Sequence, residues 1–66
     1  MNNLEAELKR NGISKADIAK LLNISIRTVH SRIAGETQWL YSECVMIRNH
    51  FFPDMDLGYL FPFLDE

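Results

Sequence analysis

Apolar side chains recur at helical spacing in several separate stretches of the chain, with polar residues and turn formers between them. Leu4 and Leu8 lie four residues apart, which predicts a first helix that ends near residue 11. Gly12 follows that helix and Gly35 follows a later one, at positions where a left-handed residue would end a helix. We therefore expect a compact all-α domain with four to five helices. The further helical segments are expected over about residues 15–22, 26–34, 40–52 and 57–60.

Residues 14–34 carry start signals for two short helices that a tight turn joins. Ser14 can cap the first helix, and Asp17 stands three residues later as its capping-box partner. Ser25 can cap the second helix, and Asn23 falls in the turn, where a residue that tolerates positive φ is needed. This is the pattern of a helix-turn-helix, whose second helix commonly enters the major groove of DNA.

Length and composition indicate a single small domain without disulfides or membrane spans. Sixty-six residues make one domain over 1–66, with the helix-turn-helix at about 14–34 and a C-terminal helix and apolar tail at 40–66. The single Cys44 excludes an internal disulfide, and the first residues lack the pattern of a signal peptide, so we expect a cytoplasmic protein. No apolar run approaches the ~20 residues that a bilayer span needs, so no membrane partner is expected.

No group of residues has the spacing of a catalytic or metal site. His30 and His50 stand far apart in the sequence, without a carboxylate or cysteine at ligand spacing beside them, and we interpret both as solvated. Cys44 lies on the apolar face of its helix and is interpreted as core filler, not as a nucleophile. We therefore expect no enzyme activity, no metal and no cofactor.

Charge is distributed unevenly along the chain, although the net charge is only −2. Residues 1–35 carry six basic and three acidic side chains, whereas residues 36–66 carry one basic and six acidic ones. Such asymmetry suits a front that faces DNA and a back that avoids it. The small positive excess of the first half predicts weak non-specific affinity, because neutralisation of phosphates supplies most of that affinity.

Both halves of the chain contain runs of residues that together form a family pattern. In the first half these runs are Ala19 to Ser25, Arg27-Thr28-Val29, Ile33 and Gly35. In the second half they are Trp39, Glu43, Ile47-Arg48, Phe51-Phe52-Pro53 and Asp56 to Phe61. The combination resembles the small Cro/repressor-type (XRE-like) helix-turn-helix regulators of phages and prophages, over roughly residues 4–61. Asn23 departs from the family, which usually has glycine there, and Lys15 replaces a glutamine that often bonds a phosphate.

The resemblance implies a lambda-repressor-like fold and a sequence-specific transcriptional regulator that occupies double-stranded operator DNA through residues 26–34. Arg27 is the best candidate for a bidentate contact to guanine, and Ile26 for contact with a thymine methyl group. The candidate base-contacting residues are Ser25, Ile26, Arg27, His30 and Ser31. The candidate phosphate-contacting residues are Ser14, Lys15, Lys20, Thr28 and Arg32.

Aromatic side chains are numerous for so short a chain, and we expect some of them to remain outside the core. The surplus would form an apolar surface for a homodimer or for another protein. The residues of this expected surface are Phe52, Tyr59, Phe61, Phe63 and Leu64. The alternative function is a helix-turn-helix module that binds a phage repressor protein and modulates it, as an antirepressor does. Net acidity and Ile26 at the groove-facing end favour this alternative.

Overall fold

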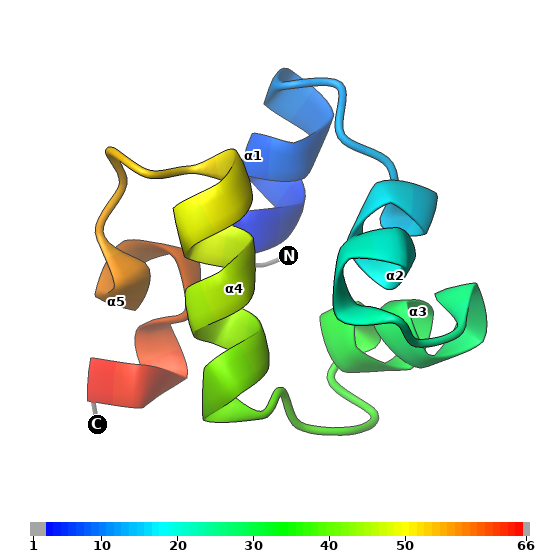
Figure 1. Cartoon of the computed structure of the whole chain (residues 1–66). Coiled ribbons are helices and arrows are strands. Elements are labelled where there is room, and N and C mark those ends of the chain that lie inside the picture. Colours follow the sequence, from blue (N-terminus) through cyan, green and yellow to red (C-terminus); the bar gives the residue numbers. More distant parts are fainter. Residues whose placement is uncertain (1–2, 66) are drawn as a thin grey trace.

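The computed structural model describes residues 3–65, which form five α-helices and a final short 3₁₀-helix (Figure 1). The expected all-α domain with four to five helices is therefore confirmed. No strand occurs within these residues, and none of their helices is long and apolar enough to cross a membrane. In chain order the elements are α1 (Asn3–Arg10), α2 (Lys15–Leu22), α3 (Ile26–Ala34), α4 (Tyr41–Phe51), α5 (Leu57–Leu60) and the 3₁₀-helix η1 (Pro62–Asp65).

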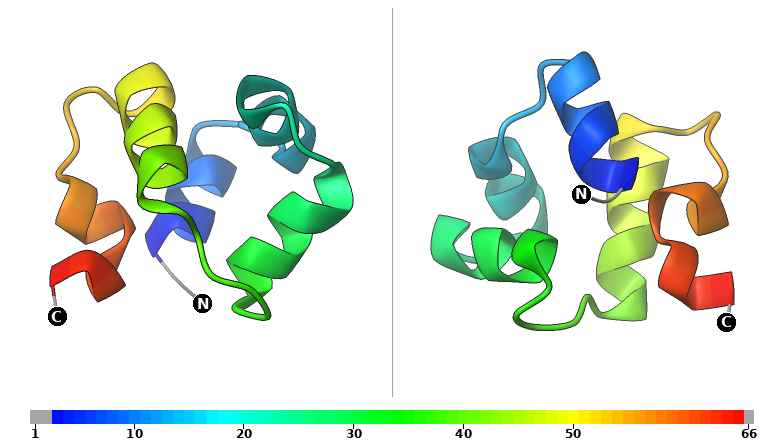
Figure 2. Two further views of the ribbon diagram at one scale, coloured as in Figure 1. Left: turned by 60° about the horizontal axis from the view of Figure 1, so that its bottom comes forward. Right: turned by 180° about the vertical axis from the view of Figure 1, so that it is seen from behind.

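Helix α4 lies between two groups of elements (Figure 1). On one side α2 and α3 pack against each other, and α2 also contacts α4. On the other side α5 and η1 pack together, and α5 contacts both α4 and α1 (Figures 1 and 2). The chain therefore brings its C-terminal segment back beside its first helix.

The core lies where these helices meet, and each of them contributes buried apolar side chains. Ile18, Val29 and Ile47 are fully buried and come from α2, α3 and α4. Burial of a side chain of this size contributes roughly 1.5–3 kcal/mol. Helices this short are not stable alone in water, so they depend on this shared core. The other buried apolar residues are Leu4, Leu8, Ala19, Ile33, Trp39, Cys44, Phe52, Leu60 and Phe61.

Three helices end in the same way, with one residue in the left-handed conformation. These residues are Gly12 at φ 68°, Asn23 at φ 58° and Gly35 at φ 83°. In each case the amide of the next residue donates to a carbonyl of the preceding helix, which is the long hydrogen bond of a Schellman motif. The N–O distances are 2.9 Å from Ile13 to Leu8, 3.1 Å from Ile24 to Ala19 and 2.9 Å from Glu36 to Ser31. The predicted helix ends at Gly12 and Gly35 are confirmed.

Gly35→Ala is expected to destabilise the protein by about 1–2 kcal/mol. A Cβ at this position would meet no atom within 4 Å, so the cost comes from placing an L-residue at φ +83°. Gly35→Asn is the matched control and should cost less, because asparagine tolerates the left-handed region better than alanine does. Urea denaturation of the three proteins measures both costs, and an unchanged midpoint for the alanine variant would contradict this expectation.

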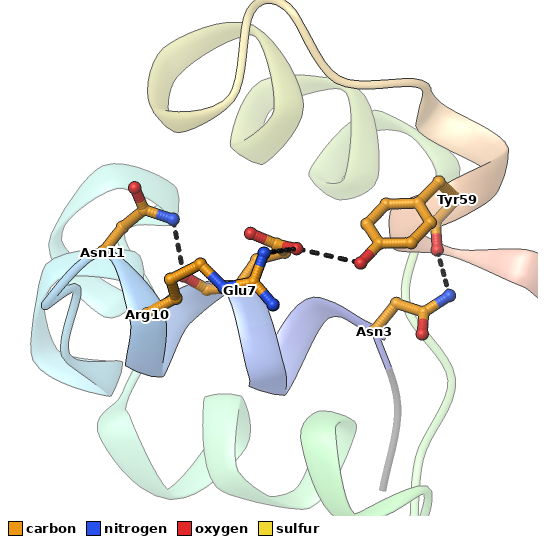
Figure 3. A network of polar contacts seen from close by, with 5 residues as sticks. All are labelled: Asn3, Glu7, Arg10, Asn11 and Tyr59. Carbon is orange, nitrogen blue, oxygen red and sulfur yellow. Dashed lines mark hydrogen bonds and ion pairs between the residues drawn. The ribbon is translucent and has the colours of Figure 1, made fainter.

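One buried carboxylate joins α1 to α5 (Figure 3). Glu7 is only 2% exposed, and its Oε2 accepts hydrogen bonds from the Tyr59 hydroxyl at 2.8 Å and from Arg10 at 3.1 Å. Asn3 Nδ2 donates to the Tyr59 carbonyl at 2.7 Å, which adds a second link between the two helices. The hydrogen bond to Glu7 raises the pKa of Tyr59, because it stabilises the protonated hydroxyl. This network therefore ties the C-terminal segment to the first helix.

The C-terminal segment contributes to the core and is not simply an exposed apolar tail. Phe61 is 1% exposed and Phe52 is 4% exposed. The Phe61 ring lies edge-on to Trp39, with ring centroids 5.8 Å apart. The expectation that Phe52 and Phe61 belong to a partner surface is therefore wrong, because the protein's own helices cover both rings. The other members of that expected surface remain exposed or half-buried, namely Tyr59, Phe63 and Leu64.

Candidate nucleic-acid interface

The short turn at residues 23–25 joins α2 to α3 and fixes how α3 is presented. The Ser25 Oγ accepts a hydrogen bond from the Thr28 amide at 3.1 Å, so the predicted N-cap of α3 is confirmed. Val29 and Ile33 then turn one side of α3 into the core, where they are 0% and 7% exposed. The opposite side of α3 faces solvent as a consequence.

The outward arc of α3 consists of Ile26, Arg27, His30, Ser31 and Ala34, which the helical repeat places side by side. Ile26 is 54% exposed, Arg27 and His30 are also exposed, and Ser31 is half-buried. Within residues 3–65 the Arg27 guanidinium has neither a hydrogen-bond acceptor nor an ion-pair partner. The arc therefore offers a free cation beside an exposed apolar side chain.

Lys15 connects the beginning of α2 to the middle of this arc. Its Nζ lies 3.2 Å from the Nδ1 of His30, although the two residues are 15 positions apart in the sequence. Lys20 is exposed further along α2. The structure thus brings one predicted phosphate-contacting residue and one predicted base-contacting residue into direct contact, and sequence spacing carries no signal for this pair.

The N-terminus of α2 is occupied by a carboxylate of the protein itself. Ser14 Oγ accepts from the Asp17 amide at 3.1 Å, and Asp17 Oδ2 accepts from the Ser14 amide at 2.9 Å. The predicted capping box is therefore confirmed. Hydrogen bonds from the backbone and then the side chain of Ser14 lower the pKa of Asp17. A phosphate at Ser14 would meet this charged carboxylate, so the predicted phosphate contact of Ser14 is not supported.

The capping box is expected to make stability depend on pH in the acid range. The folded-state pKa of Asp17 lies below its usual value of 3.8, so its contribution is complete above that pH and is lost as the pH falls further. Asp17→Asn should therefore be less stable than the wild type at neutral pH, and the difference should shrink at acid pH. Urea midpoints of both proteins at neutral and acid pH measure this, and a constant difference would contradict it.

Two other predicted phosphate contacts are engaged within the protein. Arg32 Nε lies 3.2 Å from Glu43 Oε1, as an ion pair without hydrogen-bond alignment, and its guanidinium also donates to the Gln38 carbonyl. The Arg32 side chain is only 16% exposed. Thr28 Oγ1 lies 2.9 Å from Ser25 Oγ, within the first turn of α3. The assignment of Arg32 to phosphate is thus corrected, because Glu43 neutralises its charge and holds it against α4.

The surroundings of Cys44 and His50 give neither side chain a redox or metal-binding role: Cys44 is buried in the core and His50 packs against an aromatic ring. Cys44 is fully buried, and this burial raises the pKa of its thiol to about 11, so the thiol stays neutral. His50 packs edge-on against Phe51, with ring centroids 4.7 Å apart. Residues 3–65 contain no group of three or more histidine, cysteine, aspartate or glutamate side chains that could hold a metal ion.

No protein-family model matches the chain, and neither a curated protein nor a solved structure matches it. The function is therefore inferred from the geometry and chemistry of the chain itself.

Proposed function

We propose that the chain is a sequence-specific DNA-binding transcriptional regulator of the Cro/repressor type that occupies double-stranded operator DNA through α3. The observation that carries this proposal is the outward arc of α3, with the unpaired Arg27 beside the exposed Ile26. The major groove of DNA is about 12 Å wide and admits one α-helix with its side chains. Such a protein would repress transcription by covering promoter DNA, without chemistry.

The charge distribution supports the same orientation. Lys15 and Lys20 lie on α2 and Arg27 lies on α3, so the helix pair carries basic groups on both sides of its turn. Residues 36–66, which include α4, α5 and η1, carry six acidic side chains and one basic one. Repulsion between that half and the phosphates would keep it away from the duplex.

Titration of labelled duplex DNA at several salt concentrations tests the proposal, after selection of bound sequences from random duplexes. Binding should weaken as salt rises. The logarithm of the binding constant should fall linearly with the logarithm of the salt concentration, with a slope of about −0.9 for each phosphate that a basic side chain neutralises. Phosphate contacts from Lys15 and Lys20 alone predict a slope of about −2 on this logarithmic scale. Absence of any enriched sequence, together with no binding at low salt, would contradict the proposal.

A second candidate function is a module that binds a phage repressor protein and modulates it. The observation that favours it is Ile26, which is 54% exposed at the start of α3 and could equally contact a protein. The net charge of −2 and the engagement of Arg32 with Glu43 also leave few free basic groups. This candidate predicts little DNA binding at any salt concentration, so the same titration separates the two functions.

A homodimer would allow two copies of α3 to read two half-sites on one face of the duplex. Tyr59 and Phe63 support self-association, since they are 42% and 44% exposed beside the C-terminal end of the chain. Phe63→Asp is expected to weaken the dimer at least about tenfold, because it would place a charge in an apolar contact. Sedimentation equilibrium measures this, and a wild-type protein that stays monomeric at high concentration would contradict the dimer.

A further inference from the structure

We infer that α3 selects the keto bases guanine and thymine, because the side chains of its outward arc donate hydrogen bonds and almost none can accept them. The inference rests on the proposed DNA-binding function and adds which base edges that surface fits. Its structural basis is the contact between Lys15 and His30, which fixes the ring nitrogen of His30 that carries the proton.

Lys15 determines the tautomer of His30. A lysine ammonium has three N–H donors and no acceptor, so the 3.2 Å contact requires His30 Nδ1 to be the unprotonated acceptor. In a neutral imidazole the proton is then on Nε2. No partner within residues 3–65 occupies Nε2, so His30 presents an N–H donor to the outside.

The neighbours of His30 on the arc have the same chemical character. Arg27 stands three residues earlier and carries five N–H donors and no acceptor. Ile26 stands four residues earlier and offers only an apolar surface. Ser31 has a hydroxyl that can accept, but it is half-buried. Ser25 precedes the arc as the N-cap of α3, where its hydroxyl accepts the Thr28 amide and also lies 2.9 Å from the Thr28 hydroxyl. The exposed part of the arc is therefore a set of donors beside an apolar group.

Such a surface is complementary to two of the four bases. In the major groove guanine presents O6 and N7 as acceptors, and thymine presents O4 and a methyl group. Adenine and cytosine present amino groups at the position where guanine has O6 and thymine has O4, and adenine's acceptor in this groove is N7. A protein donor that reads the O6/O4 position therefore fits guanine and thymine and excludes adenine and cytosine. The arc thus places guanine opposite Arg27, guanine or thymine opposite His30, and a thymine methyl group against Ile26.

Lys15 acts in this scheme as a positioning residue. Without its ammonium, His30 Nδ1 is free to take the proton, and Nε2 can then accept from an amino group of adenine or cytosine. Lys15→Met removes the donors and keeps an unbranched side chain. Lys20→Met removes the same charge from the same helix without touching His30, and is therefore the matched control.

Selection of bound sequences from random duplex DNA with the wild type and three variants tests the inference. The variants are His30→Ala, Lys15→Met and Lys20→Met, and the position whose preference disappears in His30→Ala is the one that His30 reads. There we expect a keto base to be preferred about five- to tenfold by the wild type, and less than about twofold by Lys15→Met. Lys20→Met should keep the wild-type preference while binding all sequences more weakly.

The outcomes separate the inference from the proposed function. Enrichment of adenine or cytosine at that position, or an unchanged preference in Lys15→Met, overturns the inference and leaves DNA binding intact. Absence of any enriched sequence, together with no binding at low salt, overturns the proposed function instead. The tautomer itself is measured without DNA, from the imidazole ¹⁵N chemical shifts at mildly alkaline pH, with His50 as internal reference. A proton on Nδ1 of His30 would overturn the inference whatever the selection shows.

Discussion

Phe61→Ala is expected to destabilise the protein by about 3–5 kcal/mol, which is the range for removal of a buried aromatic ring. The ring is 1% exposed and packs edge-on against Trp39, beside the buried Leu60. A core of this size rarely supplies more than about 3–5 kcal/mol of net stability. The variant should therefore be largely unfolded at 25 °C, as measured by circular dichroism and urea denaturation.

Phe63→Ala is the matched control for this prediction. Its ring lies 6.1 Å from that of Phe61 between centroids, but the residue is 44% exposed. Loss of a half-exposed ring should cost about 1 kcal/mol or less, so this variant should remain folded. If Phe61→Ala were as stable as Phe63→Ala, the C-terminal segment would not form part of the core.

Arg27→Ala is expected to weaken operator binding by about 1–3 kcal/mol, or about 5- to 150-fold, and to relax specificity at one base pair. The guanidinium is exposed on the outward arc of α3 and has no partner among residues 3–65, so nothing in the fold depends on it. The change should therefore leave the unfolding free energy nearly unchanged. Equilibrium titration of the selected duplex and of single-base variants measures both effects.

Two control variants, which each remove one positive charge as Arg27→Ala does, show whether Arg27 contacts a base, a phosphate or neither. Arg10→Ala removes a cation from α1, where its side chain is 72% exposed beside Glu7, and should change DNA affinity little. Lys20→Ala should weaken binding to all sequences alike and reduce the salt slope by about one. If Arg27→Ala behaved like Lys20→Ala, Arg27 would contact a phosphate. If it behaved like Arg10→Ala, α3 would not face the duplex.

Several parts of the candidate site follow from local sequence. The caps at Ser14 and Ser25 and the left-handed turn at Asn23 each depend on residues within one helical turn. Their hydrogen bonds form wherever the chain bends in that way, so the limits of α2 and α3 can be predicted without a fold. The exposure of Arg27 follows in turn, because Val29 and Ile33 define the buried side of the same helix.

Other parts could not be predicted, because they depend on contacts between distant residues. The position of Arg32 along its helix is compatible with an exposed arginine that binds phosphate. Only the packing of α4 against the rest of the fold brings Glu43 beside it. The sequence around Phe61 predicts an apolar tail, but in the folded protein this segment packs back on the core and the Phe61 ring contacts Trp39. In each case the local pattern is compatible with both environments, and only the packing of the helices selects one.

The sequence by itself therefore determined where the helices begin and end, which side of each is apolar, and that the chain is all-α. These properties arise from the helical repeat and from hydrogen bonds within a few residues. The tertiary structure alone decided which charges remain free, since Glu7 meets Tyr59 and Glu43 meets Arg32 only after the helices have packed. It also decided that Lys15 meets His30, because that distance depends on how α2 and α3 pack and not on their separation along the chain.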